Sequence, residues 1–148
     1  MIIRPYTKND ISDVIQLFRK NTPSFFDPKE EKDLINYLNH EIEDYFIVEQ
    51  DTKVIGAGGI NYFPKENAAR ISWDIIAPDI HGKGIGTQLV QYRMKHLANN
   101  TKVESIIVRT SQHTYKFYEK MGFELIKTEK DFWAKNFDLY IMKRSNIN

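Results

Sequence analysis

The stretch "DIIAPDIHGKGIGTQLV", residues Asp74–Val90, places Gly82, Gly84 and Gly86 close together between an apolar run and an amphipathic one. This pattern predicts a glycine-rich turn that opens a helix. The first N–H groups of a helix have no backbone partner and lie at the positive end of its dipole, so such a turn is suited to bind a phosphate. Several kinds of fold use a turn of this type, and the rest of the sequence has to separate them.

Length and composition limit the number of domains, the classes of partner and the location of the protein. A chain of 148 residues with 41% hydrophobic content predicts a single domain over residues 1–148. Its 21 Lys and Arg against 20 Asp and Glu give a net charge of +1, too balanced for nonspecific nucleic-acid binding. The absence of cysteine excludes a disulfide framework and a thiolate nucleophile. The start "MIIRPYTKND" has no signal-peptide core and no apolar run approaches about 20 residues, so we expect a cytoplasmic protein with no membrane partner.

Hydrophobic periodicity predicts alternating strands and helices. Helices are expected at residues 7–20, 27–40, 86–98 and 114–121. Strands are expected at residues 1–6, 44–50, 53–63, 69–77, 104–110, 123–129 and 137–143. Most of these strands follow one another in hairpins, which favours an α+β layer over a doubly wound sheet.

A second glycine-rich stretch, "VIGAGGIN", competes as a nucleotide-binding site. Gly56 and Gly58 follow an apolar pair with the spacing of a dinucleotide-binding fingerprint. However, Asn61 occupies the third glycine position, and "YFP" follows where the fingerprint requires a helix. We therefore interpret these glycines as part of a twisted or bulged strand.

The stretch "HGKGIG" does open a predicted helix, and two nucleotide-binding motifs can be compared with it. Lys83 is followed by Gly84 and not by Ser or Thr, which excludes the phosphate loop of nucleoside triphosphatases. Thr87 stands where a dinucleotide loop needs glycine or alanine, and residues 78–81 separate strand from glycines too widely. Glu104 lies near the distance expected for a ribose-binding acid, so a dinucleotide-dependent oxidoreductase stays open as an alternative.

Two motifs together resemble the GNAT superfamily of N-acetyltransferases. The family's first motif is Arg or Gln, two residues, Gly, one residue, and Gly or Ala, and here His81 precedes Gly84 and Gly86. The later stretch "SQHTYKFYEKMGFE" is similar to the family's second motif through Phe117, Tyr118, Gly122 and Phe123. The opening "IRPYTKND" also resembles the family's usual start. The resemblance covers nearly the whole chain.

This resemblance implies both a fold and an activity. The fold would be a mixed, mostly antiparallel central sheet of about six to seven strands flanked by about four helices. The activity would be the transfer of an acetyl group from acetyl-coenzyme A, as co-substrate and without a metal, to a primary amine of a small molecule or peptide. The residues implied to bind coenzyme A are Ile76, Ala77, His81, Gly82, Lys83, Gly84, Ile85, Gly86, Thr87, Ser111 and Phe117. His81 replaces the family's Arg or Gln, and Ser111 stands where the family often has Asn.

The reaction needs one proton removed from the amine and one supplied to the departing thiolate. Tyr118 matches the family's usual acid; the alternative is a core aromatic in "YKFYEKMGF". Asp74 is the only acid within the apolar run "ISWDII" and is the candidate base. The alternatives are that Asp74 pairs with Arg70 or faces solvent, and that a water relay removes the proton.

Aromatic residues in breaker-rich segments are candidates for the acceptor site. In the family these segments overlook the acceptor cleft, so Phe25, Phe26 and Trp133 are predicted to form its wall, with Phe132 beside them. Plain packing is the alternative for these side chains. The chain's histidines lack the spacing of metal ligands, so no metal site is expected.

Two further expectations concern function and assembly. A noncatalytic module that binds an acyl-coenzyme A and reports it to a partner is the alternative to an enzyme. An exposed sheet edge near residues 137–143 would allow a homodimer.

Overall fold

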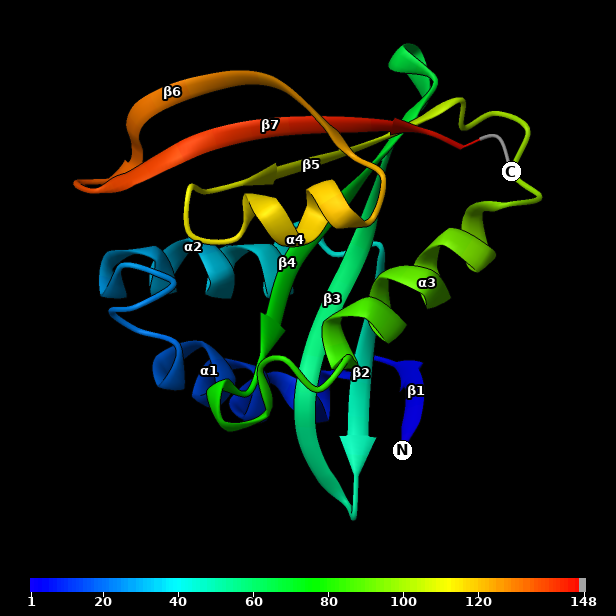
Figure 1. Cartoon of the computed structure of the whole chain (residues 1–148). Helices are drawn as coiled ribbons and strands as arrows, with labels where there is room; N and C mark the ends of the chain where they lie inside the picture. Colours follow the sequence, from blue (N-terminus) through cyan, green and yellow to red (C-terminus); the bar gives the residue numbers. More distant parts are fainter. Residues whose placement is uncertain (147–148) are drawn as a thin grey trace.

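One seven-stranded sheet runs through the molecule, with helices on both of its faces (Figure 1). The computed structural model describes residues 1–146. Its strands are β1 (Ile2–Pro5), β2 (Asp44–Gln50), β3 (Lys53–Phe63), β4 (Ala68–Ile76), β5 (Ser105–Thr110), β6 (Glu124–Ala134) and β7 (Phe137–Ser145). Its α-helices are α1 (Ile11–Lys20), α2 (Glu31–Asn36), α3 (Ile85–Leu97) and α4 (Tyr115–Lys120).

The strand order is β1-β2-β3-β4-β5-β7-β6, and only β4 and β5 are parallel neighbours. The predicted α+β fold with a mostly antiparallel sheet is therefore confirmed. No helix within residues 1–146 is both long enough and apolar enough to cross a membrane.

The first two helices begin where the sequence supplies caps. The backbone N–H of Thr7 donates to the Asp10 carboxylate at 2.8 Å, which confirms the predicted capping pair ahead of α1. Asp27 caps a 3₁₀ turn (Pro28–Glu30) that leads into α2, and a π turn (Tyr37–Glu41) follows it. This second helical stretch therefore matches the predicted range of residues 27–40 closely.

Two hydrophobic cores lie on opposite faces of the sheet. Leu89 of α3 and Tyr118 of α4 are buried against one face. Phe18 of α1 and Leu34 of α2 are buried against the other. Figure 1 shows α3 and α4 on the near side of the sheet, with α1 and α2 behind it.

The parallel junction in the middle of the sheet is short. β4 pairs with β5 only from Ala68 opposite Ser105 to Ile71 opposite Val108, and beyond this point the two strands diverge (Figure 1). The register between β3 and β4 also shifts between Ala57 and Gly59, so the prediction of glycines in a bulged strand is confirmed. The divergence opens the middle of the sheet.

One expectation about the last strands was wrong. β6 continues to Ala134 through a register shift that includes Asp131 at φ +53°, so Phe132 and Trp133 lie in a strand and not in a breaker-rich segment. The exposed sheet edge expected near residues 137–143 is formed by the strand paired with them, because β7 lies between β5 and β6. The outer strand at this end of the sheet is β6, and its residues from 124 to 132 are exposed.

Candidate active site

A cavity of about 950 Å³ opens where β4 and β5 diverge. One end reaches the glycine-rich turn before α3, and the other lies against α2 and the end of β6. The predicted site residues that line it are Phe25, Phe26, Asp74, Ile76, His81, Gly82, Gly84, Ile85, Gly86, Thr87, Ser111, Phe117, Tyr118 and Trp133. The structure does not bring Ala77 or Lys83 to its wall.

The glycine-rich turn leaves open space in front of the first turn of α3. Gly82 and Gly84 have φ values of +81° and +84°, which residues with a Cβ rarely adopt, and a Cβ at either would meet nothing within 4 Å. Gly84 caps α3 without a side-chain hydrogen bond, so the helix begins with backbone donors free of side-chain caps. Gly86 serves packing, because its Cβ would lie 3.2 Å from the Phe117 ring of α4.

The end of β4 is tied to neighbouring segments through its backbone. The Ile76 carbonyl accepts a hydrogen bond from the Asn21 side chain at 3.0 Å and lies 2.9 Å from Nε2 of His81. The N–H of Ala77 donates to the Ile55 carbonyl at 2.9 Å. Sequence reasoning missed Asn21, because its residue type after α1 carries no signal for this contact.

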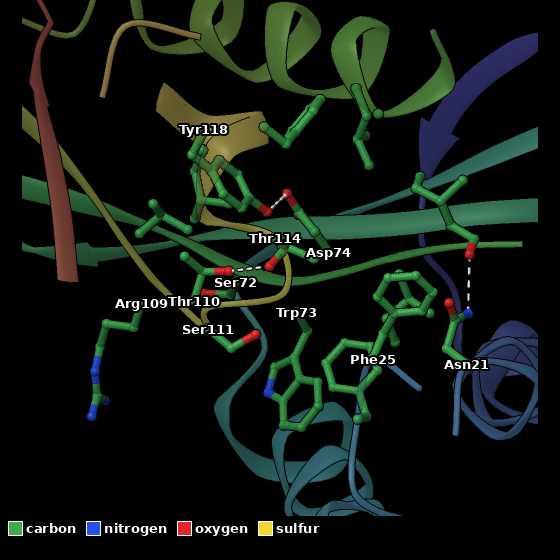
Figure 2. A pocket seen from close by; sticks show the side chains of 18 of the residues that line it. Asn21, Phe25, Ser72, Trp73, Asp74, Arg109, Thr110, Ser111, Thr114 and Tyr118 are labelled. Carbon is green, nitrogen blue, oxygen red and sulfur yellow. Dashed lines mark hydrogen bonds between the residues drawn. The ribbon is translucent and has the colours of Figure 1, made fainter. Parts of the chain in front are cut away.

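Asp74, Tyr118 and Arg93 form one hydrogen-bonded group. The Tyr118 hydroxyl donates to Oδ2 of Asp74 at 2.6 Å, and Figure 2 shows these two side chains pointing toward one another. Arg93 of α3 is fully buried and donates to both carboxylate oxygens, at 2.8 Å to Oδ2. Asp74 therefore pairs with Arg93 and not with Arg70.

The geometry bears on the predicted roles of Asp74 as the base and Tyr118 as the acid. Asp74 accepts three hydrogen bonds, two from Arg93 and one from Tyr118, and a carboxylate offers about four acceptor positions, so one position is left for the proton of an amine. Burial, followed by the nearby negative charge of Asp74, raises the pKa of Tyr118 well above its ordinary value. The phenol therefore stays protonated at neutral pH and is available as a donor.

Gly58 makes room for this buried group. A Cβ at Gly58 would overlap the Asp74 carboxylate and lie 2.8 Å from the Arg93 guanidinium. Arg93 also donates to the Gly59 carbonyl at 3.1 Å. The glycines of β3 thus bring the strand backbone against the Asp74–Arg93 ion pair.

Aromatic rings form much of the wall toward α1 and α2. Phe26 stacks on Trp73 with ring centroids 6.0 Å apart, and Phe25 meets the His81 ring edge-on at 4.9 Å. Nε1 of Trp133 donates to the Thr110 carbonyl at 3.1 Å. The structure therefore brings the predicted acceptor residues Phe25, Phe26 and Trp133 to the same cavity.

Charged side chains of both signs line the end of the cavity away from the glycine-rich turn. We call this part the acceptor end. Its carboxylates come from Glu30, Asp33, Glu41 and Glu43, and its guanidinium groups come from Arg70 of β4 and Arg109 of β5. Sequence reasoning did not assign any of the six to the site, because the four acidic residues looked like an exposed helix and loop surface and the pattern of the strands did not show which face the two arginines occupy.

Glu30 is buried among these groups. Its carboxylate accepts the N–H of Asp27 at 2.9 Å as part of the cap before α2. Burial raises the pKa of Glu30 to about 7, although that backbone hydrogen bond opposes the change. The folded protein therefore holds this proton at pH values where the unfolded chain has lost it.

Stability should consequently depend on pH through Glu30. As pH rises from about 4.5 through about 7, the wild-type protein loses stability relative to Glu30→Gln, which has no proton to lose. Comparing urea unfolding of the two proteins at pH 5 and pH 8, we expect the difference in unfolding free energy to change by about 2 kcal/mol in favour of the variant. A difference that is the same at both pH values would contradict this assignment.

Comparison with known families gives a match over most of the chain. The family model described as "Acetyltransferase (GNAT) family" matches residues 11–123. An amino-acid acetyltransferase of Actinobacillus pleuropneumoniae serotype 5b (strain L20) is 30% identical over 132 residues, which cover 86% of this chain and 28% of that protein. The chain thus spans little more than a quarter of the length of this curated relative.

Solved structures share the fold. The ribosomal-protein-S18-alanine N-acetyltransferase from Escherichia coli superposes with a TM-score of 0.80 at 14% identity, covering 99% of this chain and 94% of that one. An aminoglycoside 6'-N-acetyltransferase in complex with coenzyme A gives a TM-score of 0.76 at 18% identity, covering 100% of this chain and 98% of that one. At these identities the likeness concerns the fold alone.

Proposed function

This chain belongs to the GNAT acetyltransferase family, and on that premise we propose that it is an N-acetyltransferase. It transfers the acetyl group of acetyl-coenzyme A to a primary amine of a small molecule or peptide. The observation that carries this proposal is one continuous cavity that joins the glycine-rich turn, the Tyr118–Asp74 pair and the charged acceptor end. The solved coenzyme A complex of a protein with the same fold supports the choice of co-substrate.

Coenzyme A would lie along the open middle of the sheet. The turn from His81 to Thr87 would bind the pyrophosphate through backbone N–H groups, and the positive end of α3 favours the negative charge. The pantetheine arm would follow the end of β4 near Ile76, with Ser111 and Phe117 on the opposite side. This course would leave the thioester beside Asp74 and Tyr118.

The transfer would proceed by direct attack. The cationic amine first loses a proton, its nitrogen then forms a bond to the thioester carbonyl carbon, and the nitrogen gives up a second proton to solvent as the amide forms. The C–S bond breaks, and the sulfur leaves as a thiolate with an ordinary pKa of about 8.5. We assign Tyr118 as the donor to this sulfur: its single O–H, which donates to Asp74 in this structure, would turn from the carboxylate to the departing sulfur.

Before this step Asp74 would position the Tyr118 hydroxyl by accepting its hydrogen bond, and it would release that hydrogen when the sulfur leaves. Its ion pair with Arg93 fixes the carboxylate, and the carboxylate in turn fixes the hydroxyl. As the predicted base, Asp74 would take the amine proton at the acceptor position that Arg93 and Tyr118 leave open. A water molecule in the cavity is the other route for this proton.

A screen of amines tests the proposal. Polyamines, amino acids, aminoglycosides and peptide N-termini are each incubated with protein and acetyl-coenzyme A, and free thiol and the mass of the acetylated product are measured. At least one class should release thiol in step with product. In a second measurement, calorimetric titration gives the affinity of the protein for coenzyme A and for a nicotinamide dinucleotide.

The contrary outcomes point to different functions. If coenzyme A binds tightly and none of these amines releases thiol above background, the protein would be a noncatalytic sensor. Tight binding of a nicotinamide dinucleotide with none of coenzyme A would indicate an oxidoreductase.

A further inference from the structure

Two arginines project from the middle of the sheet into the acceptor end. Ile71 and Val108 are paired across the β4–β5 junction and are both buried in the core under α3 and α4. Because side chains alternate along a strand, Arg70 and Arg109 lie on the opposite face. In Figure 2 Arg109 extends from β5 away from Tyr118, toward the side on which Trp73 lies.

Neither guanidinium is neutralised by the protein. Within residues 1–146, neither group has a hydrogen bond or an ion pair, and Nε of Arg70 is buried without a partner. Burial and then the positive charge of Arg109 lower the pKa of Arg70, while Glu66 acts more weakly in the other direction. Two like charges in a partly buried position are unfavourable unless an anion lies between them.

Aromatic rings hold both arginines in position. The Arg70 guanidinium lies 4.2 Å from the centroid of the Phe63 ring. That of Arg109 lies 5.1 Å from the Phe132 ring and 5.3 Å from the Trp133 ring. A cation–π contact uses the charge of a guanidinium and leaves its N–H groups free to donate.

We propose that Arg70 and Arg109 bind the carboxylate of the acceptor, which is therefore an amine that carries a carboxylate, such as a free amino acid. This rests on the acetyl transfer proposed above and names the substrate class of the same site. A planar carboxylate matches the paired N–H groups of a guanidinium better than a neutral amide does. The carboxylates toward α2 would favour the cationic amine of the same molecule.

Matched acceptors test the role of the charge. The nineteen amino acids with a primary amine and their α-carboxamides, which lack the charge of the α-carboxylate, are compared as acceptors at saturating acetyl-coenzyme A. At least one amino acid should have a KM ten or more times lower than that of its carboxamide. O-phosphoethanolamine, which carries a phosphate instead, should be a poorer acceptor than that amino acid.

Substitution of the arginines tests the site itself. Arg70→Gln and Arg109→Gln should each raise the KM for the preferred amino acid by about 10- to 100-fold, the range expected for charge-assisted hydrogen bonds. The KM for the carboxamide should change less than about twofold, and affinity for acetyl-coenzyme A should hold. Arg70→Lys should recover only part of the loss, because it keeps the charge without the planar fork. Arg19→Gln is the control, since Arg19 is exposed and pairs with Glu31 outside the cavity.

Binding measurements separate this proposal from the proposed function. Amino acids are titrated by calorimetry into protein saturated with coenzyme A, where no transfer occurs. Binding that Arg70→Gln removes supports the carboxylate site even if the amine screen finds no product. Two outcomes would overturn the carboxylate site without contradicting the acetyltransferase. One is acetyl transfer with equal KM for the amino acid and its carboxamide, and the other is an equal rise in both KM values in the arginine variants. A phosphate-bearing amine preferred over every amino acid would overturn the assignment to a carboxylate.

Discussion

Gly84→Glu is expected to abolish coenzyme A binding while leaving the fold largely intact. A Cβ at this position meets no other atom within 4 Å, so the side chain would enter the space in front of α3 without disturbing the core. There the carboxylate would occupy the place assigned to the pyrophosphate and repel it. The positive φ of Gly84 adds a backbone cost of about 1 kcal/mol, which a folded domain tolerates.

The measurement is calorimetric titration with coenzyme A, accompanied by circular dichroism. Gly122→Glu is a matched control, because Gly122 has a similar φ of +89° but lies outside the cavity. It should lose comparable stability and keep its affinity for coenzyme A. Unchanged affinity in Gly84→Glu, with a native spectrum, would place the cofactor elsewhere.

Tyr118→Phe is expected to lower kcat by about 10- to 1,000-fold, because donation of a proton or hydrogen bond in the transition state is typically worth at least about 100-fold. The substitution removes only the hydroxyl and keeps the ring packed in the core. Asp74 would retain its ion pair with Arg93, so the loss of unfolding free energy should stay near 1 kcal/mol. Affinity for acetyl-coenzyme A should change little.

Tyr115→Phe provides the control from the same helix. The Tyr115 ring packs on Tyr140 with centroids 4.8 Å apart, and it does not line the cavity. Its kcat should equal that of the wild type, with both measured at saturating acetyl-coenzyme A. Equal turnover in Tyr118→Phe would remove the hydroxyl from the mechanism and leave solvent as the proton donor.

The elements of the fold were largely readable from the sequence, because local signals agree with the final packing. Periodicity and caps located the helices, and Asp51 and Thr52 indicated the hairpin between β2 and β3, where both residues have positive φ. The continuation of β6 was missed because residues 130–134 show no strand pattern of their own. Pairing with β7, which follows later in the chain, extends that strand.

The site was only partly predictable, because several of its contacts form only when distant segments of the chain come together. The glycine-rich turn and Tyr118 carry motifs, but Arg93 and the arginines of the acceptor end do not. Arg93 could have been found, since it follows Leu89 by one helical turn and so interrupts the apolar face of α3 with a charge. Arg70 and Arg109 come together only through the parallel pairing of β4 with β5, which the sequence does not specify.

The short junction between β4 and β5 also makes the sheet mechanically uneven. Four residue pairs join these strands, whereas seven join β3 to β4 and six join β5 to β7; β1 and β2 are also joined by four, but in antiparallel pairing. Parallel pairing is in addition slightly weaker per residue than antiparallel pairing. Under a pulling force the strands β1–β4 and the strands β5–β7 would separate at this junction first. A pantetheine arm bound across the junction would resist this separation, and the resistance would be lost when coenzyme A dissociates.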